Sequence, residues 1–210
     1  MPDNYLVRQA TLLPASDDSY ATARATRLGL PVITDFYLYM ALAGKAYQIR
    51  AGTITTPLVG TVPITNTSSE MCVDAASGLT ILPVSLNVSV RLGTGTVHEY
   101  ALKSVGAASS AGTAFTPLPL ILGGAASTAT ARVAATAGTV TVASEVATTT
   151  NRLWSYSNPV AVGAGNENTN HIWEPRTPTV LKGVSCVYLQ MGAATTGPSF
   201  FAHLDFLECP

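Results

Sequence analysis

Residues 86–92 alternate strictly between apolar and polar side chains, and this pattern limits the fold more than any other feature of the sequence. The apolar positions are Leu86, Val88, Val90 and Leu92. A period of two is that of a half-buried β-strand, because successive side chains of a strand point to opposite faces of a sheet. Residues 139–143 repeat the pattern with threonine at the polar positions. Both segments are therefore predicted to be strands with one buried face.

Strand signals recur along the chain, separated by glycine, proline, asparagine and serine. We expect further strands at residues 5–13, 47–55, 71–75, 79–83, 97–104, 130–135, 151–156, 180–191 and 200–207. The intervening residues supply the positive φ and the fixed φ that turns require, and residues 135–139 are predicted to form a hairpin tip. Short strands joined by such turns indicate a sandwich or a barrel. We predict an all-β fold, an antiparallel β-sandwich with the jelly roll as the favoured topology.

The sandwich domain is predicted to span residues 31–210, preceded by an N-terminal arm over residues 1–30. The arm is rich in short residues and can cross onto a neighbouring subunit, which buries surface that a lone subunit cannot bury. At the start of the domain, residues 34–44 are largely apolar, so a buried strand and a short helix both fit. Thr34 or Asp35 would cap the helix, but the buried strand is the favoured interpretation.

Residues 105–130 are rich in small side chains that surround an apolar centre at residues 115–122. A linker between two domains is one interpretation, but a free linker would not carry the leucines and the isoleucine of this centre. Pro117 and Pro119 also disfavour a central strand there. We therefore expect a long loop that docks on its own molecule or on a neighbour.

Charged side chains make up only 11% of the chain, whereas hydrophobic residues make up 47%. Ordinary soluble domains carry roughly 25% charged residues. A surface of hydroxyls, amides and small side chains can be covered by neighbouring subunits, as in permanent assemblies, whose interfaces are depleted of charge. The net charge is -1 and no segment clusters lysine or arginine, so we expect no direct contact with nucleic acid.

No membrane partner is expected, because the longest apolar stretch, residues 36–43, is far shorter than the ~20 residues that cross a bilayer. The first five residues lack the basic and apolar regions of a secretory signal. We therefore expect the protein to be made in the cytoplasm; if it ends up outside a cell, it leaves by lysis or inside a particle.

The sequence shows no arrangement of residues that is typical of a metal site, a cofactor site or an active site. Cys72, Cys186 and Cys209 are odd in number and fit no zinc motif, so we interpret them as buried, reduced thiols. The three histidines form no closely spaced pair, so no metal and no cofactor is expected. No nucleophile elbow or phosphate cradle occurs, and we expect no enzyme. A glycan hydrolase is a lesser alternative, because paired carboxylates can be distant in sequence.

Residues 166–176 are the most polar and distinctive segment of the chain. Its candidate binding residues are Asn168, Asn170, His171 and Trp173. Amide groups next to a tryptophan combine planar hydrogen bonding with an apolar stacking face, as in a sugar-binding loop. The alternatives are a surface loop whose asparagines cap turns while the tryptophan packs inward, or a contact with another subunit.

Three stretches carry a resemblance to a known class of protein: an Ala/Thr/Gly-rich strand–turn alternation at residues 125–150, a strand pair at residues 79–92, and the C-terminal residues 192–208. In these stretches the chain resembles single-domain virion proteins of tailed phages and related viruses. The resemblance implies a jelly roll or a related β-sandwich, and a trimer or larger ring on the particle. The chain departs from RNA-packaging shell proteins because it lacks a basic arm, which favours an outer or accessory component.

We therefore expect a structural subunit of a virus particle, of the capsid, decoration or other head-associated type, that acts by self-assembly. Its expected partners are copies of itself, in a trimer or larger homo-oligomer, and other virion proteins; its expected location is the virion. The alternative is a carbohydrate- or receptor-binding β-sandwich module of a virion or tail fibre. A bacterial surface-layer protein shares the composition but would normally need an export signal.

Overall fold

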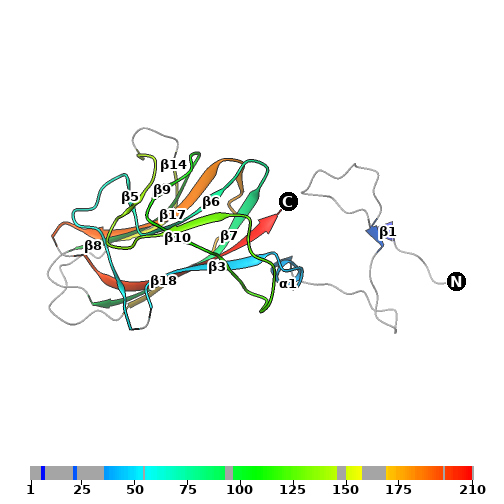
Figure 1. Cartoon of the computed structure of the whole chain (residues 1–210), viewed down its shortest axis with the longest axis horizontal. Helices are drawn as coiled ribbons and strands as arrows, with labels where there is room; N and C mark the ends of the chain where they lie inside the picture. Colours follow the sequence, from blue (N-terminus) through cyan, green and yellow to red (C-terminus); the bar gives the residue numbers. More distant parts are fainter. Residues whose placement is uncertain are drawn as a thin grey trace.

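The computed structural model describes residues 6–7, 21–22, 36–53, 55–92, 97–145, 150–157, 169–195 and 197–209. Within these ranges the chain is mostly β-strand, and two antiparallel sheets pack face to face (Figure 1). The predicted all-β antiparallel sandwich is confirmed, whereas the jelly-roll topology stays a prediction.

The first sheet has six strands, with β17 among its central strands. In spatial order they are β10 (Thr113–Phe115), β12 (Thr130–Val133), β6 (Met71–Ala75), β17 (Ser185–Ala193), β8 (His98–Val105) and β14 (Thr150–Ser157). All of these pairings are antiparallel. Strands far apart in sequence are therefore neighbours in space, which brings β6 beside β17.

The second sheet has seven strands and is built around β18. Its main path is β11 (Leu118–Pro119), β3 (Ala46–Ala51), β18 (Ser199–Cys209), β7 (Thr80–Leu92) and β15 (Thr169–Trp173); β4 (Leu58–Val59) also pairs with β18, and β16 (Leu181–Lys182) with β7. The predicted strands at residues 79–83 and 86–92 are thus one continuous strand, β7.

The main core lies between these two sheets and is supplied by alternate residues of their strands. In β7, the side chains of Leu86, Val88 and Val90 are at most 1% exposed, which confirms the alternation predicted for them. They share one cluster with Val73 of β6 and Leu189 of β17. Burying one such aliphatic side chain contributes about 1.5–3 kcal/mol, so the alternation decides which face of the strand turns inward.

A third, three-stranded sheet covers the outer face of β6 and β17. Its order is β5 (Ser68–Ser69), β13 (Val140–Thr141) and β9 (Ser110–Ala111). Val140 of β13 forms a second apolar cluster with Cys72, Cys186 and Tyr188. Because both of its faces are covered, β17 is buried along its whole length.

The carboxylate of Glu70 connects the third sheet to the loop before it. Glu70 lies between β5 and β6 and is fully buried. It accepts hydrogen bonds from the Thr61 amide nitrogen at 2.8 Å, the Thr61 hydroxyl at 2.5 Å and the Gly138 amide nitrogen at 3.0 Å. Burial raises the pKa of Glu70, although these bonds favour its ionised form. Since Gly138 belongs to the turn that leads into β13, this one side chain holds the turn in place.

The hairpin predicted at residues 135–139 is wrong. β12 pairs with β10 and β6, while β13 pairs with β5 and β9, so the strands on either side of the turn belong to different sheets. The turn has Gly138 at a φ of 62°. A hairpin tip and a crossover between sheets both use a left-handed glycine, and the local sequence therefore does not distinguish them.

The buried strand favoured for residues 34–44 is also wrong, because residues 36–42 form the helix α1 (Phe36–Leu42). Gly44 follows the helix with a φ of 70°, the left-handed conformation of a helix C-terminus. Met40 is buried and packs with Leu207 against the outer side of the second sheet. The run is apolar on every side, which made it resemble a buried strand.

The predicted loop at residues 105–130 contains the short strands β9, β10 and β11, and it docks on its own molecule through β11, which pairs with β3. Of the predicted arm, the described residues are β1 (Leu6–Val7) and β2 (Ala21–Thr22), which pair with each other.

Candidate assembly surface and polar sites

The helix α1 turns most of its apolar side chains outward. Phe36, Leu38, Tyr39 and Leu42 are between 48% and 66% exposed. The helix carries neither an acidic nor a basic residue that would solvate it. An amphipathic surface helix would place charged residues on this outer face, whereas α1 presents a second apolar face whose large side chains are about half exposed.

A second apolar segment, residues 118–122, lies beside the C-terminal end of α1. The Leu120 amide donates a hydrogen bond of 2.9 Å to the Ala46 carbonyl, and the Ile121 Cγ2 atom would lie 3.9 Å from a Cβ placed on Gly44. Leu122 is 97% exposed. We call residues 36–42 and 118–122 together the apolar surface; α1, β3 and β18 meet at this end of the sandwich (Figure 1).

The apolar surface has the composition of the centre of a permanent interface. It contains no charged side chain, and interface centres are depleted of charge. Contiguous exposed apolar patches on soluble proteins mark interaction sites. Sequence analysis singled out each of the two segments, but their contact depends on the pairing of β11 with β3, which sequence patterns do not reveal.

A polar pocket of about 260 Å³ lies beside β8 and β14 on the first sheet. Lys103 Nζ lies 2.5 Å from Glu145 Oε2 and 2.7 Å from Gln190 Oε1, and Arg152 is 2.9 Å from Glu145 Oε1. The hydrogen bond from Lys103, supported by Arg152, holds the pKa of Glu145 below its usual value. The pocket therefore presents amide and ionic groups on the outer face of the first sheet, whereas the ring of Tyr156 lies on the inner face, stacked against Tyr100.

The four candidate binding residues do not share one environment. Asn168 lies outside the described residues, and the other three belong to β15, so part of the predicted loop is a strand. Asn170 is exposed and accepts a hydrogen bond of 3.0 Å from the Ser89 hydroxyl. Trp173 is 8% exposed and belongs to the main core, so its ring is not available to stack on a sugar.

His171 packs against aromatic side chains at the edge of the main core. Its ring centroid is 4.3 Å from that of Tyr156, 5.4 Å from Tyr100 and 6.1 Å from Trp154. Tyr100 and Tyr156 are paired between β8 and β14, so these rings lie on the inner face of the first sheet and the polar pocket lies on its outer face. Because side chains alternate along a strand, Asn170 points to the opposite face of β15 from His171.

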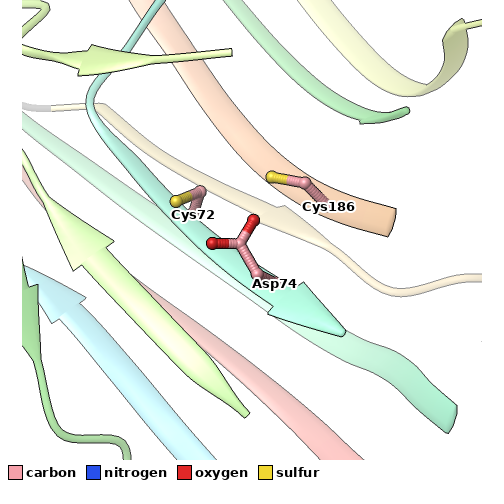
Figure 2. A group of neighbouring side chains, drawn as sticks. All are labelled: Cys72, Asp74 and Cys186. Carbon is pink, nitrogen blue, oxygen red and sulfur yellow. The ribbon is translucent and has the colours of Figure 1, made fainter. Parts of the chain in front are cut away.

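Three side chains that can ligate a metal meet on the outer face of β6 and β17 (Figure 2). Cys72 and Asp74 are two residues apart in β6, and Cys186 of β17 is paired with Asp74. One ligand atom from each residue lies within 4.8 Å of the other two, and all three residues are buried. Burial raises the pKa of Cys186 well above its usual value, and the neighbouring Cys72 and Asp74 add to this effect.

All three cysteines are buried free thiols, as predicted. The meeting of Cys72 with Cys186 was not predicted from the sequence. A Cys-x-Asp spacing on a strand places two ligands on one face, and this was the only local signal. The third ligand comes from a strand more than a hundred residues away, whose register the sequence pattern does not set.

Comparison with models of protein families, with curated proteins and with solved structures finds no match. Among the residues that the structure describes, no helix has the length and apolarity needed to cross a bilayer.

Proposed function

We propose that the protein is a structural subunit of a virus particle, of the capsid, decoration or other head-associated type. In this proposal it assembles with copies of itself into a trimer or larger homo-oligomer and joins other virion proteins on the particle. The observation that carries the proposal is the apolar surface formed by residues 36–42 and 118–122. A chain whose role is mechanical needs such a contact area, and it needs no catalytic group.

The apolar surface is suited to a permanent partner. Each large apolar side chain that passes from water into an interface contributes about 1.5–3 kcal/mol. Several such side chains together offset the roughly 4–15 kcal/mol lost when two molecules associate. A second copy of this chain is the occupant we propose, because the predicted arm of residues 1–30 ends just before α1. An arm that crosses to a neighbour would start from the edge of this surface.

The virion assignment is supported by three further properties. Only 11% of the residues are charged, the fold is an antiparallel β-sandwich, and the sequence resembles single-domain virion proteins in its strand–turn texture. None of these features calls for an enzyme, and each is suited to a subunit that packs by shape.

Sedimentation velocity of the full chain at micromolar concentration tests the proposed assembly. Wild-type protein should sediment as a trimer or larger. The double variant Leu42→Ser/Leu122→Ser should dissociate, because each central apolar contact contributes about 2 kcal/mol, or roughly a 30-fold change in the dissociation constant. Val180→Ser/Val184→Ser is the matched control, since these valines are 58% and 56% exposed and lie outside the apolar surface.

A wild-type monomer that forms no larger species on concentration would overturn the self-assembly proposal. If the control double variant dissociated as much as Leu42→Ser/Leu122→Ser, the apolar surface would not be the interface. The virion assignment has its own test: mass spectrometry of particles purified from an infected culture should detect this chain at a fixed ratio to the shell protein. Its absence from such particles would contradict that assignment.

The polar pocket favours a second candidate, a carbohydrate- or receptor-binding module. It places the Asn66 side chain beside the ionic groups around Glu145, and such a set of hydrogen-bonding groups suits the hydroxyls of a sugar. A glycan array should then show binding that Asn66→Ala abolishes. Ile172→Ala is the control, because Ile172 is 60% exposed and does not line the pocket. Absence of wild-type binding to every glycan would remove this candidate.

A further inference from the structure

The cluster of Cys72, Asp74 and Cys186 brings two thiols and a carboxylate into one buried space under the third sheet. Figure 2 shows all three side chains between β6 and β17. Cys72 and Cys186 are fully buried, and Asp74 is 6% exposed. Thiolate and carboxylate groups together are ligands of thiophilic divalent cations such as Zn²⁺.

The register of β6 and β17 disfavours a disulfide between the two cysteines. Cys186 is paired with Asp74, and Cys72 is paired with Tyr188, so the two cysteines occupy diagonal positions. Diagonal neighbours in an antiparallel pair have Cα atoms about 7–8 Å apart, whereas disulfides need at most about 6.8 Å. The two sulfur atoms can therefore share an ion more easily than they can bond to each other.

The distances among the ligand atoms suit a tetrahedral ion. Zn–S bonds of about 2.3 Å and Zn–O bonds of about 2.0–2.2 Å place tetrahedral ligands roughly 3.5–3.8 Å apart. The three ligand atoms already lie within 4.8 Å of one another, so small side-chain rotations bring them onto one ion. Three protein ligands leave one tetrahedral position for a water or for the Ser109 hydroxyl.

A second layer of hydrogen bonds orients these ligands. The Ser109 amide donates to Asp74 Oδ1 at 2.8 Å, and the Ser109 hydroxyl donates to Asp74 Oδ2 at 2.7 Å. The same hydroxyl accepts a hydrogen bond of 2.9 Å from the Cys72 thiol. Outer partners of this kind fix the orientation of metal ligands, and here they come from the loop between β8 and β9.

The charge of the site balances when an ion enters. Binding of one Zn²⁺ forms two Zn–S bonds and releases the two thiol protons to solvent, so the site gains no net charge. The Asp74 carboxylate is compensated by Arg132, whose Nε atom lies 3.9 Å from Asp74 Oδ2. That Nε atom is buried and has no hydrogen-bond partner among the described residues, so the positive guanidinium group lies next to the cluster.

We propose that Cys72, Asp74 and Cys186 form a structural binding site for one thiophilic divalent cation, with Zn²⁺ as the natural ion. The ion would cross-link β6 to β17 under the third sheet, where the apolar cluster around Val140 closes over it. The proposal is independent of the assembly of the chain into a particle.

Titration of the full chain with Co²⁺, after removal of metal under reducing conditions, tests the proposal. Wild-type protein should bind one equivalent of Co²⁺, with the thiolate charge-transfer and visible bands of a tetrahedral site, and one equivalent of Zn²⁺ should remove these bands. Cys72→Ser and Cys186→Ser should lose the bands. Ser109→Ala should weaken binding about 10-fold, as expected for loss of an outer partner.

Cys209→Ser is the matched control, because Cys209 is the third buried thiol and lies in a different cluster beside α1. It should bind Co²⁺ as the wild type does. Thermal unfolding without metal shows whether each variant folds, and Zn²⁺ should raise the melting temperature of the wild type and of Cys209→Ser but not that of Cys72→Ser or Cys186→Ser. The proposal is overturned if the wild-type chain shows no thiolate bands. It is also overturned if Cys72→Ser and Cys186→Ser bind Co²⁺ as well as the wild type does, whatever the stability of these variants.

Discussion

The buried carboxylate of Glu70 is expected to be necessary for the stability of the third sheet. Glu70→Ala removes the acceptor of the Thr61 hydroxyl and of the Gly138 amide, while the Thr61 amide keeps the Met191 carbonyl at 2.9 Å. A buried donor that loses a charged acceptor costs about 1.5–3 kcal/mol. The alanine variant loses two such hydrogen bonds, but it also avoids the desolvation cost of a buried carboxylate. The expected net destabilisation is about 2–4 kcal/mol.

Glu70→Gln keeps the shape of the side chain and separates hydrogen bonding from packing. Its carbonyl oxygen can still accept both bonds from Thr61, but its amino group meets the Gly138 N–H, donor against donor. One unsatisfied buried donor costs about 1–3 kcal/mol. The glutamine variant should therefore be less stable than the wild type and more stable than the alanine variant.

Guanidinium chloride unfolding near neutral pH measures both variants, with the shift in midpoint at constant slope as the readout. Glu174→Ala is the control, because Glu174 is exposed just after β15, and it should stay within about 0.5 kcal/mol of the wild type. The reasoning is refuted if Glu70→Ala also stays within about 0.5 kcal/mol, or if the glutamine variant is the less stable of the two.

Three further predictions use the same unfolding measurement. The folded-state pKa of Glu70 is raised above 4.5, so the native state binds the carboxyl proton of Glu70 more tightly than the unfolded state does. The stability of the wild type relative to Glu70→Gln should therefore fall as the pH rises from 4.5 through the folded-state pKa. A stability difference that stays constant over this range would contradict the raised pKa. Trp173→Ala should cost about 3–5 kcal/mol because the ring lies in the core, and a loss below about 1 kcal/mol would contradict that role. Gly112→Ala should cost about 1–3 kcal/mol, because the φ of Gly112 is 71° and the new Cβ would lie 2.6 Å from Val140 Cγ2. Gly78 has a φ of 84° but open space around it, so Gly78→Ala should cost less, about 1 kcal/mol. Equal losses of unfolding free energy in the two variants would show that the contact with Val140 does not contribute.

The sequence predicted the sandwich well where one face of a strand is buried and the other is not. β7 is the clearest case, since Leu86, Val88 and Val90 turn inward, whereas Asn87 and Ser89 are half-buried and Arg91 is exposed. In β17 the third sheet covers the second face, so the strand is buried throughout and its periodicity disappears. Such a run is recognised as buried but does not reveal what lies on either side.

Other elements could not be predicted because their partners are distant in sequence. Residues 169–173 are polar enough to resemble a loop, and they form β15 only because β7 offers its edge. Helix α1 and a buried strand fit the same apolar run, and the choice depends on which surface remains uncovered. The cysteine and aspartate cluster depends on the register of β6 and β17, for which no local pattern exists.

The strands β17 and β18, formed by residues 185–209, occupy interior positions in the two large sheets. Until residues 185–209 have left the ribosome, the strand between β6 and β8 is missing, and so is the strand between β3 and β7. A nascent or prematurely terminated chain would therefore hold four open strand edges, which are templates for aggregation. Closure by the final strands also makes most contacts long-range, which slows folding. The sandwich can form only after residues 185–209 have been made, so copies truncated before these residues are excluded from whatever the folded chain builds.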